Sequence, residues 1–279
     1  MAKVLIIGCG NLGTAIATSL HQSQHEVIGV RQSDTQLPQA MQTIQADVTQ
    51  PRSLLALENI HPNIVIYCIS ASASTDASYQ AHYVTGLKNV LATQANNQAL
   101  LHVFFVSSTR VYGQVIDDLL DENTPAMPAD FGGERLLEGE NVLKYLPCKA
   151  TSMRLSGIYG TGRLYLVNMA KDFAKWPTDN NWSNRIHRDD AASFIAFIVE
   201  KVSQNQEVAD CYIVTDDMPT QQYDVLRWLA TQMHMDSSHI KTPQTQSGKR
   251  LSNQRLRSTG FQLQYANYQV GYGEILQKL

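Results

Sequence analysis

The segment that decides the fold is KVLIIGCGNLG, from Lys3 to Gly13. Its first part, Val4 to Ile7, is a short continuous apolar run, which is typical of a buried parallel strand. Three glycines follow with the spacing G-x-G-x-x-G, and apolar residues at helical intervals come after them. A strand, a glycine-rich turn and a helix in this order predict a dinucleotide-binding unit. A glycine-rich turn without a ligand is the alternative interpretation.

Each glycine of this turn has its own physical role in the prediction. Gly8 permits a tight turn, Gly10 lets the backbone approach a pyrophosphate, and Gly13 lets the helix pack close to the strand. The first turn of the helix offers free N–H groups and a partial positive charge to the phosphates. We therefore expect the cofactor to be bound here by Gly8, Gly10, Asn11, Leu12 and Gly13.

The composition is that of an ordinary globular protein with one large or two modest domains. The chain has 279 residues and a net charge of −3, which argues against a nucleic-acid or anionic-membrane partner. We expect no membrane span, because no apolar run is long enough, and no signal peptide, because the first strand begins almost at Met1. The four cysteines are far apart, which predicts reduced thiols in a cytoplasmic protein. His21 and His25 have no third ligand nearby, so we expect no metal site.

Arg31 bears on the choice of cofactor. It follows EVIGV, Glu26 to Val30, which we interpret as the second strand. Folds of this kind that bind NAD place an acid near this point for the ribose 2′-hydroxyl, whereas an arginine accommodates the 2′-phosphate of NADP. Arg31 therefore favours NADP. An exposed arginine at a strand end, with NAD as the cofactor, is the alternative.

Two further strand ends are expected at the cofactor. Thr43 to Ala46 predicts a short strand that ends at Asp47, and Asn63 to Ile69 predicts a buried one. Small residues follow the second of these, and they leave room for a ligand at the carboxyl end of a parallel strand. We add Asp47, Ile69, Ser70 and Ala71 to the cofactor-binding set.

Four later motifs resemble one protein family. VSSTRVYG, Val106 to Gly113, is similar to the segment after strand five of the extended short-chain dehydrogenase/reductases, the NAD(P)-dependent sugar-nucleotide epimerases and dehydratases. RLSGIYGTGR (Arg154–Arg163), RIHRDDAA (Arg185–Ala192) and KRLSNQRLRSTGF (Lys249–Phe261) resemble later family motifs in the right order. The resemblance covers nearly the whole chain.

The chain departs from this family at the proton-transferring pair. Members carry Tyr-x-x-x-Lys on the helix after strand five, where the lysine lowers the pKa of the tyrosine and holds the nicotinamide ribose. Here Phe131 stands at the tyrosine position and Arg135 at the lysine position. Phenylalanine cannot exchange a proton, whereas the arginine can still bind a ribose or phosphate. The resemblance also places Tyr83 where members have an asparagine.

Other residues are candidates for catalysis and substrate binding. By resemblance, Ser108 holds the substrate oxygen, although a serine that caps the strand end is the alternative. Tyr112 and Asp130 are candidates to replace the missing phenol. The alternative interpretation is that Tyr112 has a structural role and that Asp130 is a solvated charge. Arg163 stands in a loop that faces the substrate in the family, where it can bind a phosphate or carboxylate, or it is a plain surface arginine.

We expect an α/β fold: an NAD(P)-binding Rossmann domain with a doubly wound, mostly parallel sheet, and a small mixed C-terminal substrate lobe. The Rossmann domain covers residues 1–155, with 185–214 returning to it, and the lobe covers 156–184 and 215–279. The resemblance implies a homodimer through the helices around Tyr79–Asn96 and Phe131–Leu146. Two functions remain open at this point. One is an NADP-dependent epimerase, dehydratase or oxidoreductase of sugar nucleotides or similar small polar molecules; the other is a non-catalytic NAD(P)-binding sensor or regulator.

Overall fold

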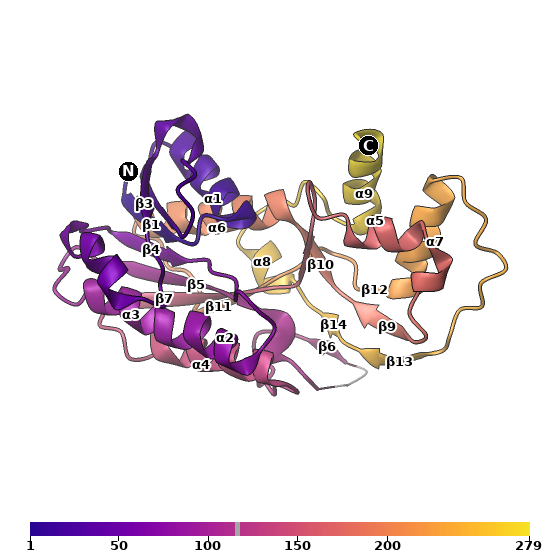
Figure 1. The fold of residues 1–279 in the computed structure, drawn as a ribbon. Coiled ribbons are helices and arrows are strands. Elements are labelled where there is room, and N and C mark those ends of the chain that lie inside the picture. Colours follow the sequence, from indigo (N-terminus) through magenta and orange to yellow (C-terminus); the bar gives the residue numbers. More distant parts are fainter. Residues whose placement is uncertain (115–117) are drawn as a thin grey trace. The chain divides into compact units, whose positions relative to one another are not determined.

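The structure is a computed structural model that describes residues 1–114 and 118–279. The chain forms two compact units, each assembled from several segments (Figure 1). Unit 1 consists of Met1–Gly113, Pro125–Arg154 and Ala192–Tyr212. Unit 2 consists of the described residues of Gln114–Thr124, together with Leu155–Ala191 and Ile213–Leu279.

A seven-stranded sheet organises unit 1, with the strand order β11-β7-β5-β4-β1-β2-β3. Its strands are β1 (Lys3–Ile7), β2 (Glu26–Arg31), β3 (Gln42–Gln45), β4 (Ile64–Tyr67), β5 (His102–Ser108), β7 (Lys149–Leu155) and β11 (Cys211–Val214). The pairs β1·β2, β1·β4, β2·β3 and β4·β5 are all parallel. The chain passes from β1 outward to β3 and returns to β4 on the other side of β1, so the order reverses beside β1. The expected doubly wound Rossmann fold is confirmed.

Helices cover both faces of this sheet: α1 and α6 lie on one face, α3 and α4 on the other (Figure 1). The α-helices of unit 1 are α1 (Asn11–Gln22), α2 (Asp76–Tyr79), α3 (Gly86–Thr93), α4 (Phe131–Leu143) and most of α6 (Arg188–Ser203). Four other short helical segments are η1 (Pro38–Ala40), η2 (Pro51–Asn59), η3 (Gln80–Thr85) and η4 (Thr109–Val111). The apolar stripe of α1, with Ile16 and Leu20, is fully buried, as are Val4 to Ile7 of β1. Burial on both sides explains why β1 and β4 are continuous apolar runs.

The helix expected around Tyr79–Asn96 is interrupted. It consists of α2, a π-helical turn η3 and α3. The fully buried Tyr67 of β4 donates a hydrogen bond from its hydroxyl to the backbone carbonyl of His82, inside the π turn. A side chain that hydrogen-bonds to a backbone carbonyl inside a helix disturbs the regular backbone hydrogen bonds of that helix. The segment η2 is a 3₁₀ helix with Pro51 at its first position.

Unit 2 is built from short strands and helices around an aromatic core. Its strands are β6 (Leu119–Leu120), β8 (Gly157–Tyr159), β9 (Asn180–Ser183), β10 (Arg185–His187), β12 (Thr220–Gln221), β13 (Thr245–Gly248) and β14 (Arg250–Leu251). Its helices are α5 (Tyr165–Ala170), η5 (Phe173–Lys175), α7 (Gln222–Gln232), α8 (Gln254–Ser258) and α9 (Tyr268–Gln277). Tyr159, Trp176, Tyr223, Tyr268 and Tyr272 form the centre of its core with aliphatic residues of α5 and α7.

Two short strands of unit 2, β12 and β13, lie in polar stretches of the chain. The stretch from Ser237 to Lys249 contains β13, which pairs in parallel with the distant β9. Its polar residues show no strand periodicity because the partner strand decides the structure. Thr220 lies in β12, and its hydroxyl donates to the Met218 carbonyl at 2.8 Å. No helix of the described chain is both long and apolar enough to cross a membrane.

Candidate functional site

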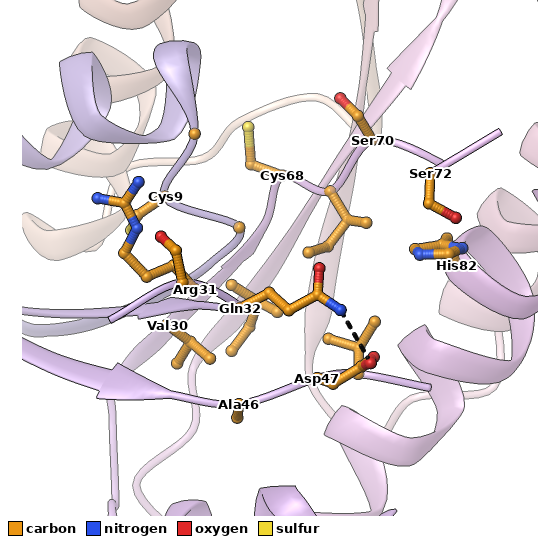
Figure 2. Close-up of a pocket in the computed structure, with 16 residues that line it drawn as sticks. Cys9, Val30, Arg31, Gln32, Ala46, Asp47, Cys68, Ser70, Ser72 and His82 are labelled. Atoms are coloured by element: carbon orange, nitrogen blue, oxygen red, sulfur yellow. Dashed lines mark hydrogen bonds between the residues drawn. The ribbon is translucent and has the colours of Figure 1, made fainter. Parts of the chain in front are cut away.

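A pocket of about 370 Å³ lies in unit 1 at the carboxyl ends of β1, β2, β3 and β4 (Figure 2). This is the crevice that doubly wound sheets use for ligands, beside the point where the strand order reverses. Its lining residues are Ile7, Gly8, Cys9, Gly10, Val30, Arg31, Gln32, Ser33, Ala46, Asp47, Val48, Cys68, Ile69, Ser70, Ser72 and His82. Most of the residues expected at the cofactor are therefore brought together here.

The glycine turn has the geometry of a pyrophosphate cradle. A Cβ on Gly8, whose φ is 98°, would lie 2.3 Å from the Cys68 carbonyl oxygen, and one on Gly13 would lie 2.2 Å from that of Gly8. At Gly10, by contrast, a Cβ would meet nothing described within 4 Å, so the space beside this backbone is open. Gly10 is the N-cap of α1, and no described side chain caps this helix. A helix N-terminus of this kind, at a glycine turn with open space beside it, suits an anion.

Arg31 ends β2 and lines the pocket with Gln32 and Ser33. Its Nε is buried and has no hydrogen-bond partner among the described residues. Leaving a buried charged donor unpaired costs about 1–3 kcal/mol or more. A phosphate oxygen is an acceptor that would remove this penalty, so the residues present fit a phosphorylated ribose.

Asp47 lies just after β3 and is held by its neighbours. Its carboxylate accepts hydrogen bonds from the Thr49 backbone N–H at 2.8 Å, the Thr49 hydroxyl at 2.7 Å and the Gln32 side-chain amide at 3.1 Å. Burial raises the pKa of this carboxyl, but these bonds, helped by the charge interaction with His82, bring it below its usual range. Asp47 is therefore an ionised acceptor that faces the pocket (Figure 2).

At the end of β4, Ile69 and Ser70 line the pocket as expected, whereas Ala71 is not among its lining residues. The Ala71 backbone instead hydrogen-bonds the Tyr83 hydroxyl. Ser72, one of the small residues after β4, also lines the pocket, and so does His82, which nothing in the sequence indicated. His82 lies in the π turn η3, which no local pattern reveals.

The candidate catalytic residues lie around the end of β5 and the start of α4. The Ser108 hydroxyl accepts a hydrogen bond from the Arg110 backbone N–H at 3.2 Å and so caps η4. Tyr112 is fully buried, and its hydroxyl accepts a hydrogen bond from Arg154 Nη1 at 2.6 Å. The Arg154 guanidinium carbon also lies 5.0 Å from the centroid of the Tyr112 ring.

Arg154 belongs to a buried network that the sequence did not reveal. Its guanidinium donates to both oxygens of Glu140, and the Ser107 hydroxyl donates to Glu140 Oε1 at 2.6 Å. Burial lowers the pKa of Arg154, but the Glu140 carboxylate outweighs it and keeps the net shift upward. The network fixes Tyr112 from the side of β7 and α4.

Asp130 caps α4. Its carboxylate accepts hydrogen bonds from the Gly133 backbone N–H at 2.9 Å and from Arg110 Nε at 2.9 Å. Partial burial raises the pKa of this carboxyl, but the two donors lower it below its usual range. Asp130 is therefore ionised and engaged, which is the state of a structural cap rather than of a proton donor.

Phe131 and Arg135, which the resemblance places at the catalytic pair, have structural partners within unit 1. The Phe131 ring packs edge-on against Tyr79, with centroids 5.5 Å apart, and the Arg110 guanidinium carbon lies 5.5 Å from the Phe131 ring centroid. Arg135 pairs with Asp76 at 2.7 Å and with Glu138 at 2.9 Å. Hydrogen bonds to these two carboxylates raise the pKa of Arg135. Its charge is thus already balanced within unit 1.

Unit 2 holds a second pocket of about 530 Å³. The exposed Arg163 lines it, together with the aromatic residues Tyr159 and Tyr272. Arg185, which the sequence did not single out, also lines it, and its buried Nη1 has no hydrogen-bond partner among the described residues. Within residues 1–114 and 118–279 there is no group of three or more side chains placed to hold a metal ion.

Comparisons with known proteins agree with this geometry. The model of the NAD dependent epimerase/dehydratase family matches residues 4–211. A putative NAD-dependent epimerase/dehydratase from Methylobacillus flagellatus is 44% identical, with a TM-score of 0.90 over 99% of this chain and 98% of that one. The search of curated proteins finds no match.

Two more distant structures share the fold. UDP-glucose 4-epimerase from Thermus thermophilus, in complex with NAD, has 18% identity and a TM-score of 0.75, covering 96% of each chain. dTDP-glucose 4,6-dehydratase from Bacillus anthracis, in complex with NAD, has 15% identity and a TM-score of 0.80, covering 99% of this chain and 96% of that one.

Proposed function

Because the chain belongs to the NAD dependent epimerase/dehydratase family, we propose that it is an NADP-binding member. In this proposal it acts as an epimerase, dehydratase or oxidoreductase on a sugar nucleotide or a similar small polar molecule. The pocket at the carboxyl ends of β1 to β4 carries the proposal, because its glycine turn and uncapped helix suit a dinucleotide pyrophosphate. When bound, the nicotinamide supplies hydride transfer.

The preference for NADP is supported by Arg31. The structures from Thermus thermophilus and Bacillus anthracis hold NAD, but identity to them is too low to transfer a cofactor. In this chain the buried Arg31 Nε lacks a partner at the end of β2. A 2′-phosphate offers an acceptor for it, and a ribose hydroxyl offers a weaker one.

For the chemistry, we propose that Ser108 holds a substrate oxygen and that Arg163 binds an anionic group of the substrate. Water, Tyr112 or Asp130 must then transfer the proton in place of the missing tyrosine. Tyr112 is buried against Arg154, and Asp130 is ionised by its donors, so both are poorly suited to exchange a proton. We therefore propose a slow enzyme, since general acid–base help contributes about 10²–10⁴-fold.

A specific observation also favours a second function. Phe131 fills the phenol position and packs against Tyr79 and Arg110, and Arg135 is neutralised by Asp76 and Glu138. A protein that keeps the nucleotide pocket and loses the proton relay suits a non-catalytic NADP sensor or regulator.

One experiment separates these functions. The purified chain, loaded with NADPH or NADP⁺, is incubated with a panel of sugar nucleotides, and absorbance at the nicotinamide band is followed together with product analysis for redox-neutral reactions. Slow turnover of any member supports the enzyme. Tight NADPH binding with no turnover across the panel supports the regulator, and failure to bind either dinucleotide contradicts both.

We further propose a cytoplasmic homodimer. Cys9, Cys68, Cys148 and Cys211 form no disulfide with one another, which suits a reducing compartment. Of the helix residues expected at a twofold contact, Leu87, Leu136 and Leu143 are buried within unit 1. Half-buried side chains such as Tyr83 and Leu137 are left for a partner. Sedimentation at micromolar concentration tests this, and a monomer contradicts it.

A further inference from the structure

Two buried charged side chains of unit 2 each have one polar atom without a hydrogen-bond partner. Arg185, at the start of β10, is 3% exposed, and Asp216, two residues after β11, is 1% exposed. Nη1 of Arg185 and Oδ2 of Asp216 have no partner among the described residues. Because a buried charged group that lacks a partner is costly, such atoms are expected to bind water or a ligand.

Backbone and side-chain contacts fix both residues. The Asp216 backbone N–H donates to the Arg185 carbonyl at 2.8 Å, so the two residues lie side by side on neighbouring segments. Arg185 Nη2 donates to the Ser183 hydroxyl at 2.6 Å, and Asp216 Oδ1 accepts from the Met218 backbone N–H at 3.1 Å. Each side chain is therefore held by one partner and retains one buried polar atom that is not hydrogen-bonded.

Arg185 connects this pair to the pocket of unit 2. It lines that pocket together with Arg163, which we propose as an anion-binding residue, and with Tyr159 and Tyr272. Burial raises the pKa of both tyrosines, so they stay neutral. Asp216 does not line the pocket, but its charge interacts with Arg185 and with both tyrosines. It is thus placed to act on a ligand through Arg185 and not by direct contact.

The charge state of Asp216 decides how much positive charge Arg185 offers to the pocket. Burial raises the pKa of the Asp216 carboxyl to about 7, against the lowering effect of Arg185. Two other carboxyl groups, the adjacent Asp217 and Asp190 on α6, also raise it. Above this pH the ionised carboxylate balances the guanidinium, and below it the guanidinium charge is uncompensated.

We propose that Asp216 makes anion binding at Arg185 depend on pH: an anionic group of the substrate binds more tightly when Asp216 is protonated. The proposal rests on the proposed function and adds a regulation of its substrate pocket. An anion at Arg185 is a like charge for an Asp216 carboxylate, so binding is accompanied by uptake of a proton from water onto Asp216. No covalent bond of the ligand changes.

The test is the affinity of the full chain for UDP-glucose, a probe whose diphosphate diester keeps its charge between pH 5.5 and 8.5. An anion that moves the titration of Asp216 by about one pH unit binds about tenfold more tightly below that titration than above it. Calorimetry at pH 5.5, 7 and 8.5 gives the dissociation constants. Repeating the titration at pH 7 in buffers of different ionisation enthalpy counts protons, and we expect uptake of about half a proton per ligand.

The main variant is Asp216→Asn, which keeps the size of the side chain and the acceptor for the Met218 N–H but removes the charge. It should bind UDP-glucose at pH 8.5 as tightly as the wild type does at pH 5.5, with less than about twofold change over the range. Asp217→Asn is the matched control, because it removes the neighbouring carboxylate, which pairs with Arg257, and should keep the wild-type pH dependence. Arg185→Gln should bind weakly at every pH.

The outcomes separate this proposal from the proposed function. Equal affinity of the wild type at pH 5.5 and 8.5, or no proton uptake at pH 7, overturns the proposal without any variant, so poor folding of Asp216→Asn cannot protect it. A pH dependence that persists in Asp216→Asn also overturns it, because another group, such as His187 beside Tyr159, then carries the titration. If UDP-glucose does not bind at any pH, the sugar-nucleotide function itself has failed, and this proposal fails with it.

Discussion

Arg154 Nη1 donates a hydrogen bond to the hydroxyl of the fully buried Tyr112 at 2.6 Å. The rest of the Arg154 guanidinium is bound to Glu140, so the phenol is one partner of a buried ion pair. A tyrosine held in this way stabilises the β7–α4 side of unit 1. Its hydroxyl is the acceptor for a guanidinium and is enclosed by protein.

Tyr112→Phe should therefore lower stability and leave cofactor binding unchanged. The substitution removes the acceptor of a buried charged donor, so we expect a loss of about 1–3 kcal/mol in the free energy of unfolding. Urea denaturation of the variant and the wild type measures it. A variant of wild-type stability that loses all turnover would contradict the structural role and make Tyr112 the proton carrier.

Arg31→Ala should abolish the preference for NADPH over NADH. A charge-assisted contact to a 2′-phosphate contributes about 1.5–3 kcal/mol, which corresponds to roughly tenfold or more in affinity. Fluorescence titration with both reduced cofactors gives the ratio of dissociation constants in the wild type and the variant. Arg52→Ala, an exposed arginine in η2, is the control. Equal affinities in the unmutated protein would count against NADP.

Asp130→Asn should destabilise the protein at neutral pH but not in acid. Its pKa is lowered in the folded state, so its contribution is complete above the ordinary value of about 3.9 and disappears as the pH falls through the folded value. At pH 7 we expect a loss of about 1 kcal/mol, as for other helix caps. Thermal unfolding between pH 2.5 and 7 measures the gap between the two proteins, with Glu134→Gln in the same helical turn as the control. A gap that widens toward low pH would refute this role.

Phe131→Tyr combined with Arg135→Lys should raise turnover. The pair puts a phenol beside a cation at the positions that the sequence resemblance assigns to them, and proton transfer of this kind contributes about 10²–10⁴-fold. The measurement is the rate on whichever sugar nucleotide the wild type turns over, or on the panel if it turns over none. Phe131→Leu with Arg135→Lys is the control without a phenol. A wild type that already reaches the rate of the double variant would show that another residue carries the proton.

The parts of the site that lie within one strand and turn could be predicted from sequence. Gly8, Gly13 and Arg31 are placed by the β1–α1 turn and the end of β2, so a short window holds all the information needed. The fold followed from the same motif and from the buried runs of β1 and β4.

What could not be predicted depends on partners far away in the sequence. His82 lines the pocket from a π turn, and its backbone carbonyl accepts a hydrogen bond from Tyr67, which lies on another element. Arg135 is turned toward Asp76, at the start of α2, by a charge pair that no local pattern shows. Such contacts form only in the folded chain.

The division of unit 1 among three segments has a consequence for biosynthesis. Its edge strand β11 begins at Cys211, and without that strand β7 presents an unpaired edge. On the ribosome, the nucleotide-binding sheet stays incomplete until most of the polypeptide has been made, and the intervening residues of unit 2 emerge first. An exposed strand edge invites pairing with other chains. A nascent chain arrested before Cys211 is therefore a natural client for chaperones, and a fragment that stops at Leu155 is a poor choice for expressing this domain alone.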